Sequence, residues 1–376
     1  MNEKGLTTIN LKQMNRSKVY QYIYKNKAVS KLQIVQDLQM GLSTVSQNLN
    51  ILEKEGLIER NGYFDSTGGR KAQAIRIVSG FRISIGIGIL KDMFHITAVD
   101  LYGNTLFTST VPHPYSNTPS YYEQIAKEIL GFITANHYED NILGVSIATQ
   151  GITSPDNTKV TYGNIMNNTG MRLEDFSRHL PYPCHLEHDS KSAACLELWS
   201  HQNLDSAVIF LLNRNLGGAV ITGHKIHQGN SMHSGAIEHM CINPDGPLCY
   251  CGNRGCLETY CSANALEQAS GLPIKEFFFQ LREKKSPQLS QIWEDYLNHL
   301  SFAMKNLNMV VDAPMIISGY LAPYFTEEDI DYLIKHINSA SPFPLERESI
   351  LIGVHGQYTP AIGAALFYIQ QFINSV

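Results

Sequence analysis

The sequence lacks the features that would place it in or beyond a membrane. Its 376 residues contain no uninterrupted run of about 18 apolar residues, so no transmembrane helix is expected. The first twelve residues are polar and lack the apolar core of a secretory signal. The seven cysteines are an odd number, and three of them are clustered, which argues against a disulfide framework. These absences predict a protein of the reducing cytoplasm without a membrane partner.

Length and charge predict more than one domain. A chain of 376 residues, with 43% hydrophobic and 17% charged residues, is globular in composition and too long for one ordinary core. Residues 1–80 carry 12 lysines and arginines against 6 acidic residues, whereas residues 81–376 carry 17 against 28. A basic amino-terminal domain (1–80) ahead of an acidic body (81–376) indicates that only the first part contacts a polyanion.

A cluster of metal-binding residue types lies near the middle of the chain. Cys249, Cys251 and Cys256 fall within eight positions, and His239 lies ten residues before the first of them. Three thiolates and an imidazole are a complete tetrahedral ligand set for structural Zn²⁺, and the intervening glycines allow the backbone to wrap tightly. A chance group of buried cysteines is the alternative, but glycines and prolines make a poor core segment. The cluster predicts a zinc site within residues 239–256.

The segment Asp245–Glu258, together with His239, closely resembles the zinc signature of the ROK family, which groups sugar kinases with sugar-responsive repressors. The resemblance implies an actin-like ATPase fold with a ligand cleft between two lobes. It is strongest at 43–71 and 235–264 and does not by itself distinguish a kinase from a repressor. It also implies that Zn²⁺ is held by His239, Cys249, Cys251 and Cys256, with Glu258 facing a sugar pocket.

Residues 10–60 are predicted to form three helices. Apolar residues at helical spacing define the first, Asn15–Tyr24, while Ser30 and Ser43 are predicted N-caps of the second and third. Gly56 is a natural stop for the third helix. Two strands at 57–60 and 74–77 would follow, which makes a winged helix-turn-helix. The residues predicted to point inward are Leu32, Val35 and Leu38 in the second helix and Val45, Leu49 and Leu52 in the third.

The third helix and the turn between the two strands supply the predicted DNA contacts. Short hydroxyl and amide side chains reach phosphates and base edges in a major groove. Glycines followed by two cations suit a narrow minor groove, and Ser66–Arg70 is similar to the linker of ROK repressors. For the helix alone, an ordinary polar face is the alternative. The predicted contacts are Ser43, Thr44, Ser46, Gln47 and Asn50 on the helix and Gly68, Gly69, Arg70 and Lys71 in the turn.

From residue 82 onward, strands alternate with helices, which predicts an α/β body with two lobes. The predicted strands are Ile83–Leu90, Phe94–Val99, Leu143–Ala148, Ala207–Leu212, Val310–Ser318 and Ile350–Val354, with a helix at Tyr121–Thr134.

Two turns that a kinase of this family needs around the ATP phosphates are altered. In Gly86–Lys91, Gly88 stands where the family has an aspartate. In Asn213–Gly218, bulky side chains replace a Gly-Thr-Gly turn, although Arg214 alone could attract a phosphate. The sequence therefore predicts a protein that is not an enzyme.

The residues that would bind sugar are better preserved. Asp189 matches the family's catalytic aspartate, which without ATP would accept a hydrogen bond from a sugar hydroxyl; a helix N-cap is the alternative. Asn167 aligns loosely with a sugar-binding asparagine, and a turn is the alternative there. Ala236 replaces the family's sugar-binding glutamate, while Glu238 is an added acid beside the histidine. The resemblance implies a sugar site of Asn167, Asp189, His239 and Glu258.

These observations predict a DNA-binding transcriptional regulator, a repressor of carbohydrate-metabolism genes that a sugar or sugar derivative controls. The two-fold symmetry of helix-turn-helix operators predicts a homodimer or a dimer of dimers on double-stranded DNA. Two alternatives stay open: a ligand-independent or protein-regulated repressor with a vestigial cleft, and an ATP-dependent sugar kinase.

Overall fold

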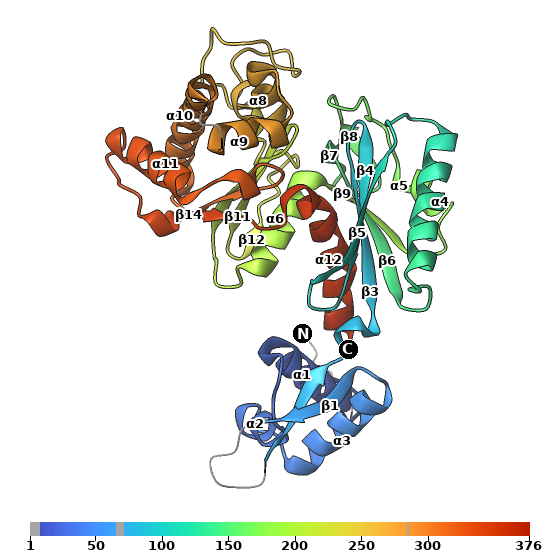
Figure 1. Cartoon of the computed structure of the whole chain (residues 1–376). Coiled ribbons are helices and arrows are strands. Elements are labelled where there is room, and N and C mark those ends of the chain that lie inside the picture. Colours follow the sequence, from blue (N-terminus) through green and yellow to red (C-terminus); the bar gives the residue numbers. More distant parts are fainter. Residues whose placement is uncertain (1–7, 65–70, 284–285) are drawn as a thin grey trace.

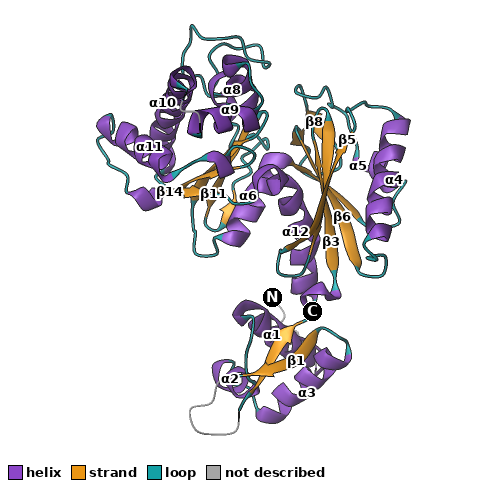
Figure 2. Ribbon diagram, in the orientation of Figure 1, coloured by secondary structure: helices purple, strands orange, loops and turns teal. Residues whose placement is uncertain are grey.

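The computed structural model describes residues 8–64, 71–283 and 286–376. A small amino-terminal module lies below two larger lobes, which stand side by side (Figure 1). Each lobe is built on a sheet with helices packed against it (Figure 2). The predicted class, a winged helix-turn-helix followed by a two-lobed α/β body, is confirmed. Every helix among the described residues is too short or too polar to traverse a bilayer.

The amino-terminal module consists of three helices and a hairpin. Ser30 caps the second helix through a reciprocal pair of hydrogen bonds with Gln33, as the sequence indicates. Gly56 adopts the left-handed conformation (φ 77°) directly after the third helix. The two strands pair antiparallel to form the wing. In chain order the elements are α1 (Thr8–Asn26), α2 (Lys31–Asp37), α3 (Leu42–Lys54), β1 (Ile58–Tyr63) and β2 (Gln73–Ile77).

Two predictions for this module are wrong. The N-cap of α3 is Gly41, and Ser43 lies inside the first turn, because the chain turns into the helix two residues earlier than expected. Leu32 is 61% exposed, whereas Ile34 is fully buried. The short helix α2 has only seven residues, so apolar spacing alone does not decide which of its faces packs on the core.

The first lobe contains a five-stranded sheet in the order β5-β4-β3-β6-β9. The long strand β3 is buried along its whole length because helices cover the sheet on both faces. The helix α4 (Pro119–Ala135) covers the outer face (Figure 1), and α5 (Leu173–Ser177) and a small hairpin lie near it. The strands are β3 (Ile83–Ile89), β4 (Met93–Val99), β5 (Thr105–Pro112), β6 (Ile142–Thr149), β9 (Cys184–His188) and the hairpin β7 (Ile152–Thr153) and β8 (Val160–Tyr162).

The second lobe repeats this topology with the order β12-β11-β10-β13-β14, again with one parallel and one antiparallel half. The prediction of a strand from Val310 is wrong at its start. Val310 and Val311 end the helix α10, and the left-handed Asp312 (φ 48°) separates them from the strand β13. The strands are β10 (Ala207–Leu212), β11 (Leu216–Thr222), β12 (Lys225–Ile226), β13 (Met315–Ser318) and β14 (Ile350–Ile352). The helices are α7 (Glu258–Cys261), α8 (Ala263–Ser270), α9 (Ile274–Arg282), α10 (Pro287–Val311) and α11 (Glu327–Ser339).

Two helices, α6 (Asp189–Ser200) and α12 (Thr359–Ser375), lie between the two sheets (Figure 1). They pack on each other where Gly363 faces the backbone of Ser192. A Cβ atom at Gly363 would lie 1.7 Å from the Ser192 carbonyl oxygen, so only glycine allows this approach. The two helices therefore form a closely packed pair that joins the lobes.

The amino-terminal module packs directly against the body. Ile369, Ile373 and Val376 of the α12 end share one apolar core with Val19, Tyr20 and other module residues. The Tyr24 hydroxyl donates to the Leu101 carbonyl at 2.8 Å, and its ring stacks on Tyr102 with centroids 5.1 Å apart. Trp199, near the end of α6, donates to the Tyr102 carbonyl at 3.1 Å. The module is thus connected to both α6 and α12.

We predict that Leu52→Ala destabilises the module by about 2–5 kcal/mol, because the side chain is fully buried and its removal leaves a cavity. Leu32→Ala is the matched control, and its exposed position should limit the loss to under about 1 kcal/mol. Urea denaturation of the full chain measures both. Equal losses in the two variants would show that the burial pattern of α2 is wrong.

Candidate functional site

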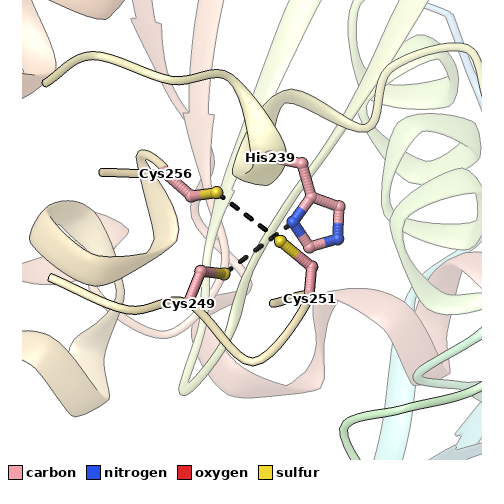
Figure 3. A group of neighbouring side chains, drawn as sticks. All are labelled: His239, Cys249, Cys251 and Cys256. Carbon is pink, nitrogen blue, oxygen red and sulfur yellow. Dashed lines mark hydrogen bonds between the residues drawn. The ribbon is translucent and has the colours of Figure 1, made fainter. Parts of the chain in front are cut away.

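The four predicted metal ligands lie together in the second lobe. His239 ends a short 3-10 turn, Ile237–His239, and the three cysteines lie in the loop that leads to α7. The four side chains point toward a common centre (Figure 3). Gly255 is left-handed (φ 68°), and a Cβ atom there would lie 1.5 Å from the Asn243 carbonyl oxygen, so the loop folds back on itself only with glycine.

The distances within the cluster suit a tetrahedral metal. All four ligand atoms lie within 4.8 Å of one another. The Sγ atoms of Cys251 and Cys256 are 3.7 Å apart, and Cys249 Sγ lies 3.9 Å from His239 Nδ1. Metal–sulfur bonds of about 2.3 Å in a tetrahedron place neighbouring sulfurs about 3.8 Å apart. Burial, together with the neighbouring thiols, raises the pKa of Cys256 to about 12, and a bound divalent cation would favour its thiolate form.

A pocket between the lobes lies beside this cluster, and His239 belongs to both. Its Nδ1 faces the cysteines, while its Nε2 lies 3.5 Å from the Tyr250 hydroxyl. The pocket has an empty volume of about 360 Å³ with its mouth included. Its polar walls come from the first lobe through Gln150, Tyr162, Asn164 and His188 and from the second lobe through Glu238, His239 and Tyr250.

Glu238, the added acid, lines the pocket. Its side chain is 13% exposed, and its Oε1 lies 3.9 Å from His239 Nε2, which is too long for a hydrogen bond. Its Oε2 is buried and has no hydrogen-bond partner among the described residues. Burial, and to a smaller extent the nearby carboxyls of Asp189 and Glu258, raises the pKa of Glu238 to about 8. The structure therefore places it in the pocket wall rather than in contact with His239.

Asp189 lies at the start of α6, one position inside the helix, since His188 is the N-cap. The N-cap alternative for Asp189 is thus wrong. The residue is 8% exposed, and its Oδ1 accepts from the Ser190 hydroxyl at 3.2 Å and lies 3.3 Å from His188 Nε2. Burial raises the pKa of Asp189 to about 7. His188, its neighbour, lines the pocket.

The other two predicted sugar contacts lie elsewhere. Both oxygens of Glu258 accept hydrogen bonds, from Asn215 Nδ2 at 2.7 Å and from the Leu216 amide at 2.6 Å. Glu258 therefore ties the cysteine-rich loop to the β10–β11 turn and does not belong to the pocket wall. Asn167 is exposed, has a left-handed backbone (φ 56°) and does not line the pocket, whereas Asn164 does.

The two turns that the sequence predicts to be altered phosphate turns line a common cavity between the lobes. Lys91 in the β3–β4 turn and Arg214 in the β10–β11 turn line one small cavity, next to the pocket that Glu238 lines. Arg214 lies 3.5 Å from Glu267 and over the ring of Tyr320. His95 lies nearby in β4, where burial and Arg214 lower its pKa to about 4. Sequence reasoning did not identify His95.

The predicted DNA contacts on α3 lie on one side of the module. Ser43, Gln47 and Asn50 are exposed, and Thr44 and Ser46 are half-buried. The Ser46 hydroxyl donates to the Leu42 carbonyl at 2.7 Å, and Arg60 donates to Asn50 Oδ1 at 2.8 Å. Lys71 is exposed, while Gly68, Gly69 and Arg70 lie outside the described residues.

Sequence reasoning missed most of the pocket wall. Gln150 directly follows strand β6, at the carboxyl end where α/β sheets place ligands, and this position was a usable signal. His188 directly precedes Asp189, and Tyr250 lies between two predicted metal ligands. Tyr162 ends the short strand β8 and Asn164 follows it, in a segment with no sequence pattern that marks either residue.

We predict that the stability difference between Asp189→Asn and the wild type changes with pH. The carboxyl group of Asp189 has a pKa of 3.8 in the unfolded chain and about 7 in the folded chain. Between these two pH values, only the unfolded chain has lost the carboxyl proton. The wild type should therefore lose up to about 1.4 kcal/mol per pH unit relative to the variant as pH increases through this window. Denaturant titrations at several pH values measure this loss of stability. Asp331→Asn, which changes an exposed aspartate of α11, is the control. A constant difference would contradict the raised pKa.

Known proteins with this architecture include regulators and kinases. A ROK family transcriptional regulator, described as a homologue of the Escherichia coli MLC protein, matches with a TM-score of 0.74, 16% identity and 97% coverage of both chains. A ROK family glucokinase from Streptomyces griseus, in complex with glucose and AMPPNP, matches with a TM-score of 0.66 and 20% identity, covering 77% of this chain and 99% of that one. At these identities the matches show the fold.

Sequence comparison gives named relatives. NagC of Escherichia coli K12, a DNA-binding transcriptional dual regulator, is 27% identical over 262 residues, which are 69% of this chain and 64% of NagC. The match thus spans less than two thirds of NagC. The xylose repressor of Bacillus subtilis is 28% identical over 279 residues, 72% of this chain and 71% of that protein. The xylose repressor of Caldicellulosiruptor bescii is 23% identical over 357 residues, covering 88% and 89%. The sequence profile of the ROK family matches residues 82–371, most of the chain. The chain belongs to the ROK family.

Proposed function

We propose that this protein is a DNA-binding transcriptional regulator, a repressor of carbohydrate-metabolism genes that a sugar or sugar derivative controls. One observation carries the proposal: the helix α6 begins beside the interlobe pocket at Asp189 and ends with Trp199 against the amino-terminal module. At about 1.5 Å per residue, its twelve residues span about 18 Å. The names of the relatives, which include a sugar repressor in two genera, support the same function.

In this proposal residues 1–80 are the DNA-binding domain and residues 81–376 are the sugar-binding body. The exposed side chains of α3 would enter the major groove, and the wing around Lys71 would contact the backbone or minor groove. The excess of basic residues before position 81 supports contact with phosphates. A two-fold symmetric operator would be bound by a homodimer or a dimer of dimers.

A sugar in the interlobe pocket would act through the paired helices. A ligand shifts an equilibrium only if it binds the two conformations with different affinity. The pocket has walls on both lobes, so a bound sugar favours the arrangement in which both walls contact it. Since α6 and α12 join the lobes and both contact the module, a change of lobe angle would also change the position of the module.

We further propose that the four-ligand cluster binds Zn²⁺. Three thiolates and one imidazole, with the distances given above, are the donor set that Zn²⁺ prefers. The metal would supply structural bonds that hold the cysteine-rich loop to the turn carrying His239. His239 would then hold its Nε2 toward the pocket, and Glu258 would position the β10–β11 turn.

We propose no ATP-dependent activity, because both phosphate turns carry bulky or charged side chains where a nucleotide needs backbone amides and space. A second candidate, a repressor controlled by a protein or by no ligand, is supported by one observation. Three of the four predicted sugar contacts, Asn167, Asp189 and Glu258, are not among the residues that line the pocket.

Fluorescence anisotropy tests the proposal. DNA from upstream of the gene that encodes the chain is titrated at fixed salt, alone and with neutral, amino and phosphorylated sugars. We expect specific binding that at least one sugar weakens or strengthens. Binding indifferent to all sugars would support the second candidate, and no preference over scrambled DNA would reject this operator.

The same assay tests the recognition helix. We predict that Gln47→Ala weakens binding to the specific DNA by about tenfold or more, with scrambled DNA little affected, because an exposed amide on α3 reads base edges. The matched control, Gln288→Ala, changes an exposed glutamine at the start of α10, far from the module, and should bind as the wild type does. Equal binding by Gln47→Ala would remove this residue from the interface.

Elemental analysis tests the metal. We expect about one zinc per wild-type chain, and we expect Cys256→Ser to lose it and to melt several degrees lower, since metal binding contributes to folding. Cys184→Ser, in strand β9 away from the cluster, should keep both zinc and melting temperature. Zinc retained in full by Cys256→Ser would contradict the assignment.

A further inference from the structure

We propose that the groove between α1 and α3 binds a phosphate of the DNA backbone, with Lys12 as the cation that holds it. The inference rests on the proposed function, because it adds a second DNA contact beside the helix that reads the bases. It follows from the residues that line the groove, from the charge of α1 and from the pairing of the neighbouring ions.

The groove lies between α3 and its neighbour in the module. Lys12, Gln13 and Arg16 line it from α1, Thr44 and Gln47 line it from α3, and the end of α12 closes it. Its volume is about 850 Å³ with its mouth included. A major groove of DNA is about as wide as one helix, so the phosphates at its edge lie beside a helix inserted there. DNA that α3 reads therefore passes the mouth of this groove.

The helix α1 is the source of positive charge among the helices of the module. It carries Lys12, Arg16, Lys18 and Lys25 and no acidic residue. The helices α2 and α3 each carry one basic and one acidic residue, so neither has a net charge. No aspartate or glutamate is among the described residues that line the groove. The phosphate backbone is therefore attracted to the α1 side of the recognition helix.

Lys12 is the cation of the groove that is free to bind a ligand. Its side chain is exposed and forms no ion pair with any described residue. Arg16, in contrast, is already engaged, since its guanidinium donates to both carboxylate oxygens of Glu55, at 3.0 and 2.5 Å. This pair also neutralises Glu55, the acidic residue that caps the end of α3. A phosphate that enters the groove thus meets one uncompensated positive charge.

Neutral donors beside Lys12 complete a site for a phosphate. Gln13 is exposed and offers an amide N–H, and Thr44 offers a hydroxyl group. The Asn48 amide is not available, because it donates to the Thr44 carbonyl at 2.9 Å. Amide and hydroxyl side chains supply many of the phosphate contacts in protein–DNA complexes, and these contacts position the protein without reading the sequence. One free cation with two neutral donors matches that role.

Anisotropy titrations at several salt concentrations test the inference. The wild type and Lys12→Gln are each titrated with the upstream DNA and with scrambled DNA, between about 50 and 200 mM salt. One phosphate contact contributes about 0.9 to the slope of log K against log salt concentration. We therefore expect Lys12→Gln to lower this slope by about 0.9 and the affinity by about eightfold at about 0.1 M salt. Unlike the loss in Gln47→Ala, this loss should be equal on both DNAs.

Lys18→Gln is the matched control. Lys18 is exposed on the same helix and loses the same charge, but it does not line the groove, because its position six residues later turns it to another face. Lys18→Gln should keep the wild-type slope, as should Lys12→Arg, which retains the charge. All three side-chain changes are at exposed positions, so the melting temperature should stay at the wild-type value.

The outcomes separate this inference from the proposed function. An unchanged slope in Lys12→Gln, or an equal loss in Lys18→Gln, would overturn the phosphate contact. If the wild type still prefers the upstream DNA in that case, the proposed function stands. A wild type that binds neither DNA in a salt-dependent manner would reject both.

Discussion

The apolar core shared by the amino-terminal module and the end of α12 is the contact on which the rest of the molecule depends. Ile369 and Ile373 are buried there against Val19 and Tyr20, and each buried aliphatic side chain contributes about 1.5–3 kcal/mol. Separating the module from the body would expose all of them at once. The module is therefore held in a defined orientation, and any change of that orientation must involve α12.

Local signals allowed much of the fold to be predicted. Ser30, Gly56 and the alternation of strands with helices each determine structure through nearby residues, and the structure agrees with them. The errors occur where tertiary packing decides. Val310 and Val311 have β-branched side chains typical of strands, yet they continue α10, whose inner face is fixed by buried Leu300 and Met304. Leu32 is exposed because a helix of two turns packs on its neighbours through the adjacent face.

The candidate site shows the same division. The metal cluster was visible in the sequence because its ligands lie within 18 residues and the loop closes on itself. A cleft between the lobes was expected, but most of its wall was not predicted, since Gln150, His188 and Glu238 come from separate elements that only the two-lobed fold brings together. Glu258 illustrates the limit of resemblance: it was expected to face a sugar pocket, but its hydrogen bonds to Asn215 and Leu216 give it a bracing role within the second lobe.

The contact between Gly363 and Ser192 determines which motions the body can make. With a helix backbone directly against another, sliding α12 by one turn along α6 would bring a residue of the same face, Pro360 or Phe367, to the Ser192 carbonyl, where even a single methyl group has no room. This contact therefore favours closure of the lobes by rotation, as in a hinge, over sliding of the two helices. A hinge amplifies displacement with distance, so a small closure at the pocket becomes a larger swing at the far end of α12.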